Sequence, residues 1–220
     1  MSLETLNERL KKFVINGQED AAQKTASEIL NAGVDPLEVI EMSLSSAMIT
    51  VGEKFEKGEY FLPDLMSAAA AMQAATHVLT AEMKEESKEK LKAKKIGRVV
   101  VGTVSGDIHD IGKNILALLL EANRFDTYDL GKDVDSMKFI EKAAEVQADI
   151  IALSALMTTT KPAQKEVIEF LNEMRLGDRY IVMVGGAPTS KEWAEEIGAD
   201  GWAETAEQGV KLAQTLIRDR

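Results

Sequence analysis

The segment RVVVGTVSGDIHDIGKNILALLLEAN, residues 98–123, decides the fold. Its first six residues, 98–103, are mostly apolar and predict a buried strand, whereas the apolar run over 111–123 predicts a helix. A glycine-containing loop joins them, and the same order of strand, loop and helix recurs along the rest of the chain. Further strands are expected at 127–130, 149–154, 180–184 and 201–203, with helices at 136–146, 162–175, from 190 and from 207. This alternation predicts an α/β domain with a doubly wound parallel sheet, in which ligands bind at the carboxyl ends of the strands.

The first 82 residues have helical periodicity instead. Apolar side chains recur every three to four residues, and helices are expected near 3–15, 18–31, 36–56 and 62–82. Short loops join these helices, so the pattern predicts an antiparallel four-helix bundle. Residues 82–95 hold ten charges of both signs in fourteen positions, which indicates a solvated linker. We therefore expect a bundle of residues 1–82, a charged linker of residues 83–96 and a sheet domain of residues 97–220.

Composition excludes several classes of protein. The 26 basic and 37 acidic side chains give a net charge of −11, which disfavours a nucleic-acid or anionic-membrane surface. The absence of cysteine excludes disulfides, iron–sulfur clusters and thiolate nucleophiles, and two histidines are too few for a multi-histidine metal site. No apolar run approaches the length of a transmembrane helix, and the N-terminus does not have the pattern of a secretory signal. A soluble, cytoplasmic protein is expected.

Small residues and hydroxyls follow the expected strands, which predicts a pocket for a large and mostly neutral ligand. Among them, His109 is the strongest candidate for a metal ligand. Asp107 lies two positions earlier, and a carboxylate that accepts the proton of one ring nitrogen makes the other nitrogen a better metal donor. The alternative is that this Asp-x-His is only a capped turn. The chain has no GxxxxGK[ST] phosphate loop, and no acidic pair ends the first strand as a phosphoacceptor site of the response-regulator type requires.

Three spaced motifs carry a resemblance to a known family. Asp107-x-His109-x-x-Gly112 is followed after 41 residues by Ser154-x-Leu156 and after 28 more by Gly185-Gly186. This series resembles the cobalamin-binding signature of the B12-binding domain shared by methionine synthase, corrinoid methyl carriers and some mutases, whose sheet is flavodoxin-like. Residues 58–63, GEYFLP, resemble the glycine–aromatic–leucine–proline turn of the cap bundle that precedes this domain in methionine synthase and the methyl carriers. The resemblance covers essentially the whole chain.

The resemblance implies a role for each motif. His109 is expected to be the lower axial ligand of cobalt, with Asp107 as its hydrogen-bond acceptor and Thr160, where the family has serine, as the next member of the relay. Phe61 and Leu65 are expected to cap the upper face of the cofactor. Corrin and nucleotide tail are expected to contact Gly106, Asp107, Ile108, His109, Asp110, Ile111, Gly112, Ser154, Leu156, Thr158, Gly185, Gly186, Thr205 and Ala206.

The resemblance further implies a corrinoid methyl carrier that binds methylcobalamin or a related corrinoid and is not catalytic without its partners. A substrate-specific methyltransferase would load the cobalt, and a second one would transfer the methyl group to tetrahydrofolate or coenzyme M, with a possible reductive activase. The alternative is a B12-binding sensor, against which the net charge and the lack of a basic DNA-binding helix weigh. A flavodoxin-like scaffold without cofactor would require the three motifs to be accidental.

Overall fold

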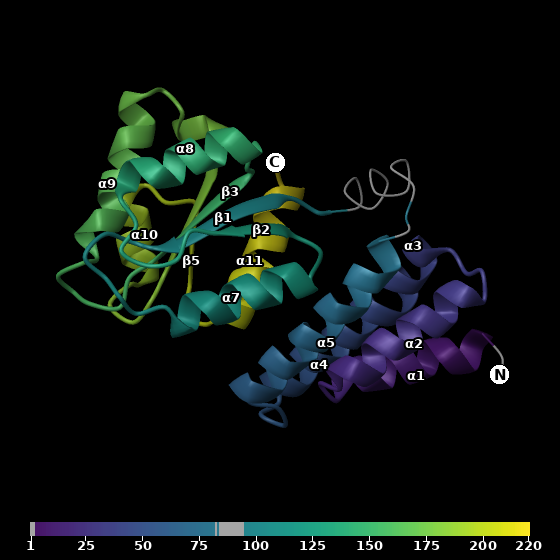
Figure 1. The fold of residues 1–220 in the computed structure, drawn as a ribbon. Helices are drawn as coiled ribbons and strands as arrows, with labels where there is room; N and C mark the ends of the chain where they lie inside the picture. Colours follow the sequence, from purple (N-terminus) through teal and green to yellow (C-terminus); the bar gives the residue numbers. More distant parts are fainter. Residues whose placement is uncertain (1–2, 82, 84–94) are drawn as a thin grey trace. The chain divides into compact units, whose positions relative to one another are not determined.

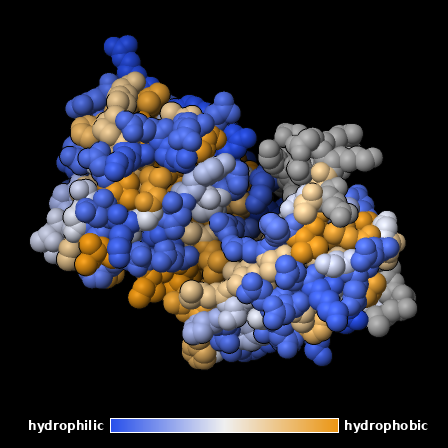
Figure 2. All heavy atoms as spheres, in the orientation of Figure 1, coloured by the Kyte–Doolittle hydropathy of each residue, from blue (hydrophilic) through white to orange (hydrophobic). Residues whose placement is uncertain are grey.

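The computed structural model describes residues 3–81, 83 and 95–220, which fall into two compact units, residues 1–95 and 96–220 (Figure 1). Residues 84–94, most of the expected charged linker, lie outside the described residues. On the face shown in Figure 2, hydrophilic side chains cover most of each unit and apolar side chains gather in smaller patches. None of the described helices combines the length and the apolar character needed to span a bilayer.

The first unit confirms the predicted bundle. Its helices are α1 (Leu3–Ile15), α2 (Glu19–Asn31), α3 (Pro36–Val39), α4 (Ser46–Glu56) and α5 (Leu62–Ala81), with a π-helical segment, η1 (Ile40–Ser45), between α3 and α4. The helix expected over 36–56 is thus interrupted by a wider turn. Its start is as predicted, because the side chain of Asp35 accepts a hydrogen bond from the backbone N–H of Leu37 and Pro36 occupies the first helical position. Helix α2 packs against α1 and α5, and the apolar stripes of the helices form a buried core.

The second unit is a five-stranded parallel sheet. Its strands are β1 (Arg98–Thr103), β2 (Asp126–Asp129), β3 (Ile150–Ser154), β4 (Ile181–Gly185) and β5 (Gly201–Ala203), in the order β2-β1-β3-β4-β5. The chain leaves β1 toward β2 on one side and returns to β3 on the other. The carboxyl ends of β1 and β3 therefore form the topological switch point, where open α/β sheets bind their ligands.

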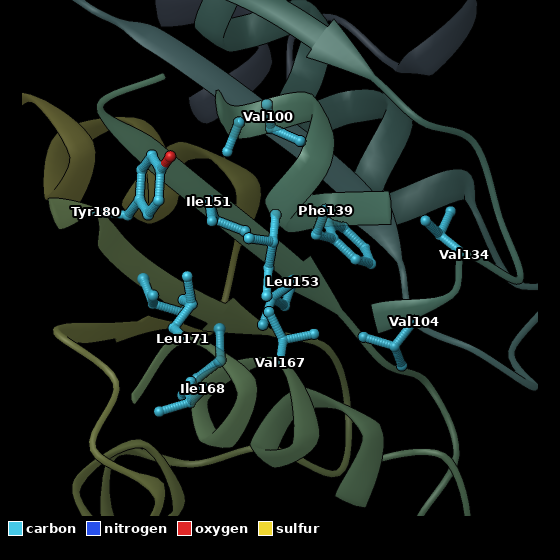
Figure 3. Close-up of a cluster of buried hydrophobic side chains, with 14 of the residues drawn as sticks. Val100, Val104, Val134, Phe139, Ile151, Leu153, Val167, Ile168, Leu171 and Tyr180 are labelled. Carbon is cyan, nitrogen blue, oxygen red and sulfur yellow. The ribbon is translucent and has the colours of Figure 1, made fainter. Parts of the chain in front are cut away.

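Helices cover both faces of this sheet (Figure 1). One face carries α7 (Ile111–Ala122) and α11 (Ala206–Arg218), which pack against each other. The other carries α8 (Ser136–Val146), α9 (Pro162–Glu173) and α10 (Lys191–Ile197), and the larger apolar core lies between these helices and the strands. Figure 3 shows Leu153 of β3 within this core, together with Phe139 of α8 and Val167 of α9. Side chains alternate along a strand, so Ala152 and Ser154 face the opposite side, toward α7 and α11.

Candidate functional site

A cavity of about 370 Å³ opens at the carboxyl ends of β1, β3, β4 and β5, with α7 and α11 as its far wall. It lies at the switch point that the topology indicates. Eleven of the residues expected from the sequence line it: Ile108, His109, Asp110, Ile111, Gly112, Ser154, Leu156, Gly185, Gly186, Thr205 and Ala206. The sequence motifs, which are far apart along the chain, therefore meet in one pocket.

Asp107 lies behind the cavity wall and holds the loop together. Its side chain is completely buried, and both carboxylate oxygens accept hydrogen bonds. Oδ1 accepts from the backbone N–H of His109 at 3.1 Å and lies 2.8 Å from Nδ1 of the same residue. Oδ2 accepts from the hydroxyl of Thr160 at 2.6 Å and from the backbone N–H groups of Leu156 and Met157 at 2.7 and 3.2 Å. One carboxylate thus joins the His109 loop to the loop after β3.

These hydrogen bonds decide the charge of Asp107. Burial alone raises the pKa of a carboxyl group, but the hydrogen bonds from the Thr160 hydroxyl, the Leu156 backbone and His109 outweigh it and hold the pKa of Asp107 well below its ordinary value. Asp107 is therefore an anion at neutral pH, and the shared proton resides on Nδ1 of His109. That tautomer leaves the lone pair of Nε2 free for a metal.

The hydroxyl of Thr160 makes the hydrogen bond to Asp107 that the resemblance assigns to a serine. Its 2.6 Å hydrogen bond to Asp107 is the shortest in this cluster, and the hydroxyl also lies 3.0 Å from the carbonyl oxygen of Met157. The extra methyl group of Thr160 points toward Gly106, where a Cβ would lie 3.5 Å away, in ordinary contact. The relay Thr160–Asp107–His109 is therefore assembled in this structure.

His109 itself remains accessible, with 44% of its side chain exposed at the cavity. Around it, Ile108, Ile111 and Leu156 are exposed to 63%, 65% and 46%, an unusual concentration of large apolar side chains on a surface. A Cβ atom added to Gly112, in the first turn of α7, would have no atom within 4 Å beyond its chain neighbours and the backbone of its own helix. The surroundings of His109 thus form a broad apolar rim with open space above the helix start.

The inner wall of the cavity is small and apolar. Val101, Ala152 and Met183 line it from the sheet, and Leu116 lines it from α7. Lys113 is the one lysine among the lining residues, and its ammonium group lies 2.6 Å from both carboxylate oxygens of Asp129, which neutralises it. The wall formed by the strands is thus uncharged, which suits the large and mostly neutral ligand that we expect, although Asp110 and Glu204 also line the cavity.

The glycine pair at the end of β4 has a structural reason that the sequence does not reveal. Gly186 has φ +115°, and a Cβ there would lie 1.8 Å from the carbonyl oxygen of Ala155, which no side chain can tolerate. At Gly185 a Cβ would lie 3.3 Å from the carbonyl oxygen of Ala203. The resemblance gave both glycines only as expected contacts of the cofactor. Gly186 is required first because the backbones after β3 and β4 touch.

Some expected residues lie elsewhere. Gly106 and Asp107 are behind the cavity, and Thr158 is exposed outside its lining because a tight turn closed by Thr160 N–H to Met157 O carries it away. In the bundle, Leu65 is fully buried in α5, so it is a core residue with no free surface, whereas Phe61 is 66% exposed.

The α4–α5 turn fixes the backbone of Phe61. Its N–H donates to the side chain of Asp64 at 2.8 Å, and its carbonyl accepts from the N–H of Leu65 at 3.1 Å. The neighbouring Tyr60 hydroxyl donates to the carbonyl of Ile15 at 3.1 Å. An exposed aromatic ring is therefore presented on a rigid turn.

Three supporting residues were not predicted. The buried hydroxyl of Thr103 donates to the carbonyl of His109 at 3.0 Å. Asp133 accepts from the N–H of Gly106 at 2.7 Å and donates its own N–H to the carbonyl of Asp107 at 3.0 Å. Gln164, which is fully buried, bonds to the ends of β3 and β4. Only Thr103 had a signal in the sequence, as a hydroxyl at the end of an apolar strand.

The donor set suits a metal that is already chelated. Among the residues that the structure describes, no three His, Cys, Asp or Glu side chains converge to hold an ion. The accessible His109, the apolar rim around it and the cavity behind the rim fit the protein ligand, the ring and the tail of a bound corrinoid.

Comparisons with known proteins agree with this geometry. Residues 97–211 match a model described as a B12 binding domain, and residues 6–80 match a second model of the same description. A dimethylamine corrinoid protein of Methanosarcina acetivorans is 46% identical over 217 residues, which cover 99% of this chain and 100% of the relative. A corrinoid protein of Desulfitobacterium hafniense is 43% identical over 213 residues, which cover 97% and 98% of the two chains.

Solved structures of proteins named for cobalamin are also similar to this chain. A chain of the methanol:cobalamin methyltransferase complex of Methanosarcina barkeri matches with a TM-score of 0.86 and 31% identity, over 99% of this chain and 81% of that one. A cobalamin-binding protein of Desulfitobacterium hafniense matches with a TM-score of 0.70 and 30% identity, over 96% and 97%.

Proposed function

We propose that this chain, which belongs to the B12-binding family of corrinoid proteins, carries methyl groups on cobalt with His109 as the lower axial ligand. Membership of the family gives the cofactor, a cobalamin or related corrinoid, and the role of methyl carrier. The observation that carries the assignment of His109 is its hydrogen bond to the buried, ionised Asp107, which leaves Nε2 free at the cavity.

The bound corrinoid supplies a cobalt atom that accepts and releases the methyl group. The protein controls how strongly Nε2 of His109 donates to that atom. His109 would hold the metal through Nε2, while its Nδ1 proton is donated in a hydrogen bond to Asp107. The Asp107 carboxylate would thereby orient the imidazole ring and make Nε2 a stronger donor. The hydrogen bond from the hydroxyl of Thr160 helps to keep Asp107 ionised.

The remaining cavity residues would hold the ligand. The exposed Ile108, Ile111 and Leu156 offer an apolar surface for the corrin ring. Ser154, Thr205 and Ala206 also line the cavity and would contact the nucleotide tail. The hydroxyl of Ser154 makes no hydrogen bond to the described residues, so it is available to the tail.

We assign the upper-face cap to Phe61 alone. The support is its 66% exposure on a turn whose backbone is held by Asp64, an arrangement that exposes an aromatic ring at a fixed position. Leu65 supports that turn from the bundle core, and its buried side chain offers no surface to a cofactor. A ring over the methyl group would shield it from water and oxygen.

Partners follow from the names of the relatives. Similar chains are named for dimethylamine and trimethylamine, and the structural neighbour belongs to a methanol:cobalamin methyltransferase complex. We infer that the partner methyltransferase selects the methyl donor and that a second methyltransferase passes the methyl group to tetrahydrofolate or coenzyme M. A reductive activase would reduce cobalt that has become oxidised. None of these relatives is named as a regulator, so the sensor alternative is set aside.

Reconstitution tests the proposal. The full-length chain loaded with cobalamin should show the absorption spectrum of a corrinoid that has lost its own base and gained a histidine ligand. His109→Ala should still bind cobalamin through the pocket and lose that spectral form, whereas His77→Ala, which alters the other histidine, should leave it unchanged. Identical spectra for His109→Ala and the unaltered protein would mean that His109 is not the ligand.

A further inference from the structure

Gln164 is a buried amide that the proposed mechanism does not use. It lies in the first turn of α9, its side chain is completely buried, and its amide makes three hydrogen bonds. Nε2 donates to the carbonyl of Leu153 at 2.9 Å and to the carbonyl of Gly185 at 3.1 Å, while Oε1 accepts from the indole N–H of Trp193 at 3.0 Å. Both donors and the acceptor are therefore satisfied within the protein.

The two carbonyls lie side by side at the ends of neighbouring strands. Ser154 and Gly185 are the last register pair of β3 and β4, and the N–H of Ala155 adds one more rung to the carbonyl of Gly185 at 3.1 Å. Gln164 bonds that same carbonyl and reaches across to Leu153. Its amide therefore links the ends of β3 and β4 at the point where the backbone hydrogen bonds between them stop. We call this pair of side-chain hydrogen bonds the clip.

The clip reaches the cavity wall from behind. Helix α9 covers the sheet face opposite to α7 and α11, and Val167, one turn after Gln164, packs in the core with Leu153 (Figures 1 and 3). The peptide groups that Gln164 holds belong to the segments 153–154 and 185–186, which line the cavity on the other face. Gln164 therefore fixes the position of this wall without contacting the ligand.

The spacing of these two strand ends has little tolerance. Gly186 already approaches Ala155 so closely that a Cβ would lie 1.8 Å from the carbonyl oxygen. A small separation or rotation of the two ends would move Ser154 and the glycine pair, and thus change the width of the deep pocket. Thr160 lies one turn before Gln164 at the same helix start, so the clip also braces the segment that carries the relay hydroxyl.

We propose that Gln164 is a positioning residue that sets the width of the slot for the nucleotide tail of the corrinoid. This inference rests on the proposed cofactor site and adds a residue that discriminates corrinoids with a tail from those without. A ligand that lacks the tail uses the rim near His109 and does not need the clip.

Gln164→Met tests the inference because it conserves volume and removes only the polar atoms. The Gly185 carbonyl keeps its bond from Ala155, and the half-buried Trp193 can bond to water, so the variant should fold. In the full-length chain, affinity for cobalamin should fall about tenfold, whereas affinity for cobinamide, which has no nucleotide, should change less than about twofold. Amide exchange at Ala155 should be faster in the cofactor-free variant.

Two further variants serve as a second test and as a control. Trp193→Phe removes the donor to Oε1 together with part of the ring, keeps both bonds from Nε2 of Gln164, and should shift cobalamin affinity in the same direction by a smaller factor. Gln214→Met removes a similar amide in α11 that bonds to Asn123 away from the cavity, and it should match the unaltered protein. Equal losses for both corrinoids, or unchanged exchange at Ala155, would overturn the role of Gln164. Failure of the unaltered chain to bind either corrinoid would overturn the proposed function instead.

Discussion

A single carboxylate carries the electrostatics of the site. Asp107 is fully buried, yet its pKa lies below the ordinary value of 3.8 because its hydrogen bonds outweigh the cost of burial. A carboxyl group with a lowered pKa in the folded state stabilises the fold above its unfolded-state pKa, and this contribution is lost as pH falls through the folded-state value.

Asp107→Asn should therefore lower the free energy of unfolding by roughly 2–4 kcal/mol at pH 7, since an amide NH₂ must then face N–H and O–H donors. The difference between the two proteins should stay constant from about pH 7 to 5 and shrink only below about pH 4. Urea unfolding at a series of pH values measures it. A difference that disappears already near pH 6 would contradict an ionised Asp107 as its source.

The relay hydroxyl can be separated from the bulk of its side chain. Thr160→Val keeps the shape but removes the donor to Asp107, and we expect a loss of about 1–2 kcal/mol in stability together with weaker histidine ligation. Thr160→Ser keeps the donor and should behave like the unaltered protein. Thermal unfolding and the cobalamin spectrum follow the two effects. Equal behaviour of the Val and Ser variants would show that the hydroxyl is dispensable.

At the scale of elements, two glycines of the same cavity differ in what they tolerate. Gly112 lies in the first turn of α7 with open space at its Cβ position, so Gly112→Ala should fold with unchanged or slightly raised stability, by up to about 1 kcal/mol. Because Gly112 lines the cavity, the added methyl group should weaken corrinoid binding.

Gly186→Ala should fail at the folding step instead, because its methyl group would overlap the Ala155 carbonyl and its φ is +115°. Calorimetry without cofactor, followed by cobalamin titration of whichever variant folds, distinguishes the two positions. A stable Gly186→Ala protein would mean that the backbones after β3 and β4 separate readily.

The elements were largely predictable from the sequence, and the contacts between them were not. Periodicity placed α1 at 3–15 as observed and β3 within one residue, because apolar spacing reflects which face is buried. The π-helical segment at 40–45 left no mark in that spacing. Gln164 was missed for a related reason: a glutamine in an amphipathic helix is normally exposed, and only the tertiary fold brings two carbonyl groups to it.

The whole molecule consists of two units with separate cores. Every residue of the Thr160–Asp107–His109 relay and of the cavity lies within residues 96–220, and the hydrogen bonds that position His109 come from this unit. The bundle therefore contributes no described contact to the relay. If each unit folds by itself, as domains with their own cores usually do, the cofactor site should survive removal of the bundle.

The fragment of residues 96–220 should accordingly bind cobalamin with the histidine-ligated spectrum of the full chain. Its methyl–cobalt bond should be more sensitive to light, because without Phe61 the methyl radical formed by photolysis escapes before it recombines, and reduced cobalt should oxidise faster. Phe61→Ala in the full chain should shift both rates in the same direction by a smaller amount, whereas Met174→Ala, which alters an exposed apolar side chain in the other unit, should shift neither. The measurement is the rate of methylcobalamin photolysis under constant illumination in air. If the fragment were as photostable as the full chain, the bundle would not shield the upper face of the cofactor. The exposed Phe61 would then be expected to contact a partner protein, such as a methyltransferase.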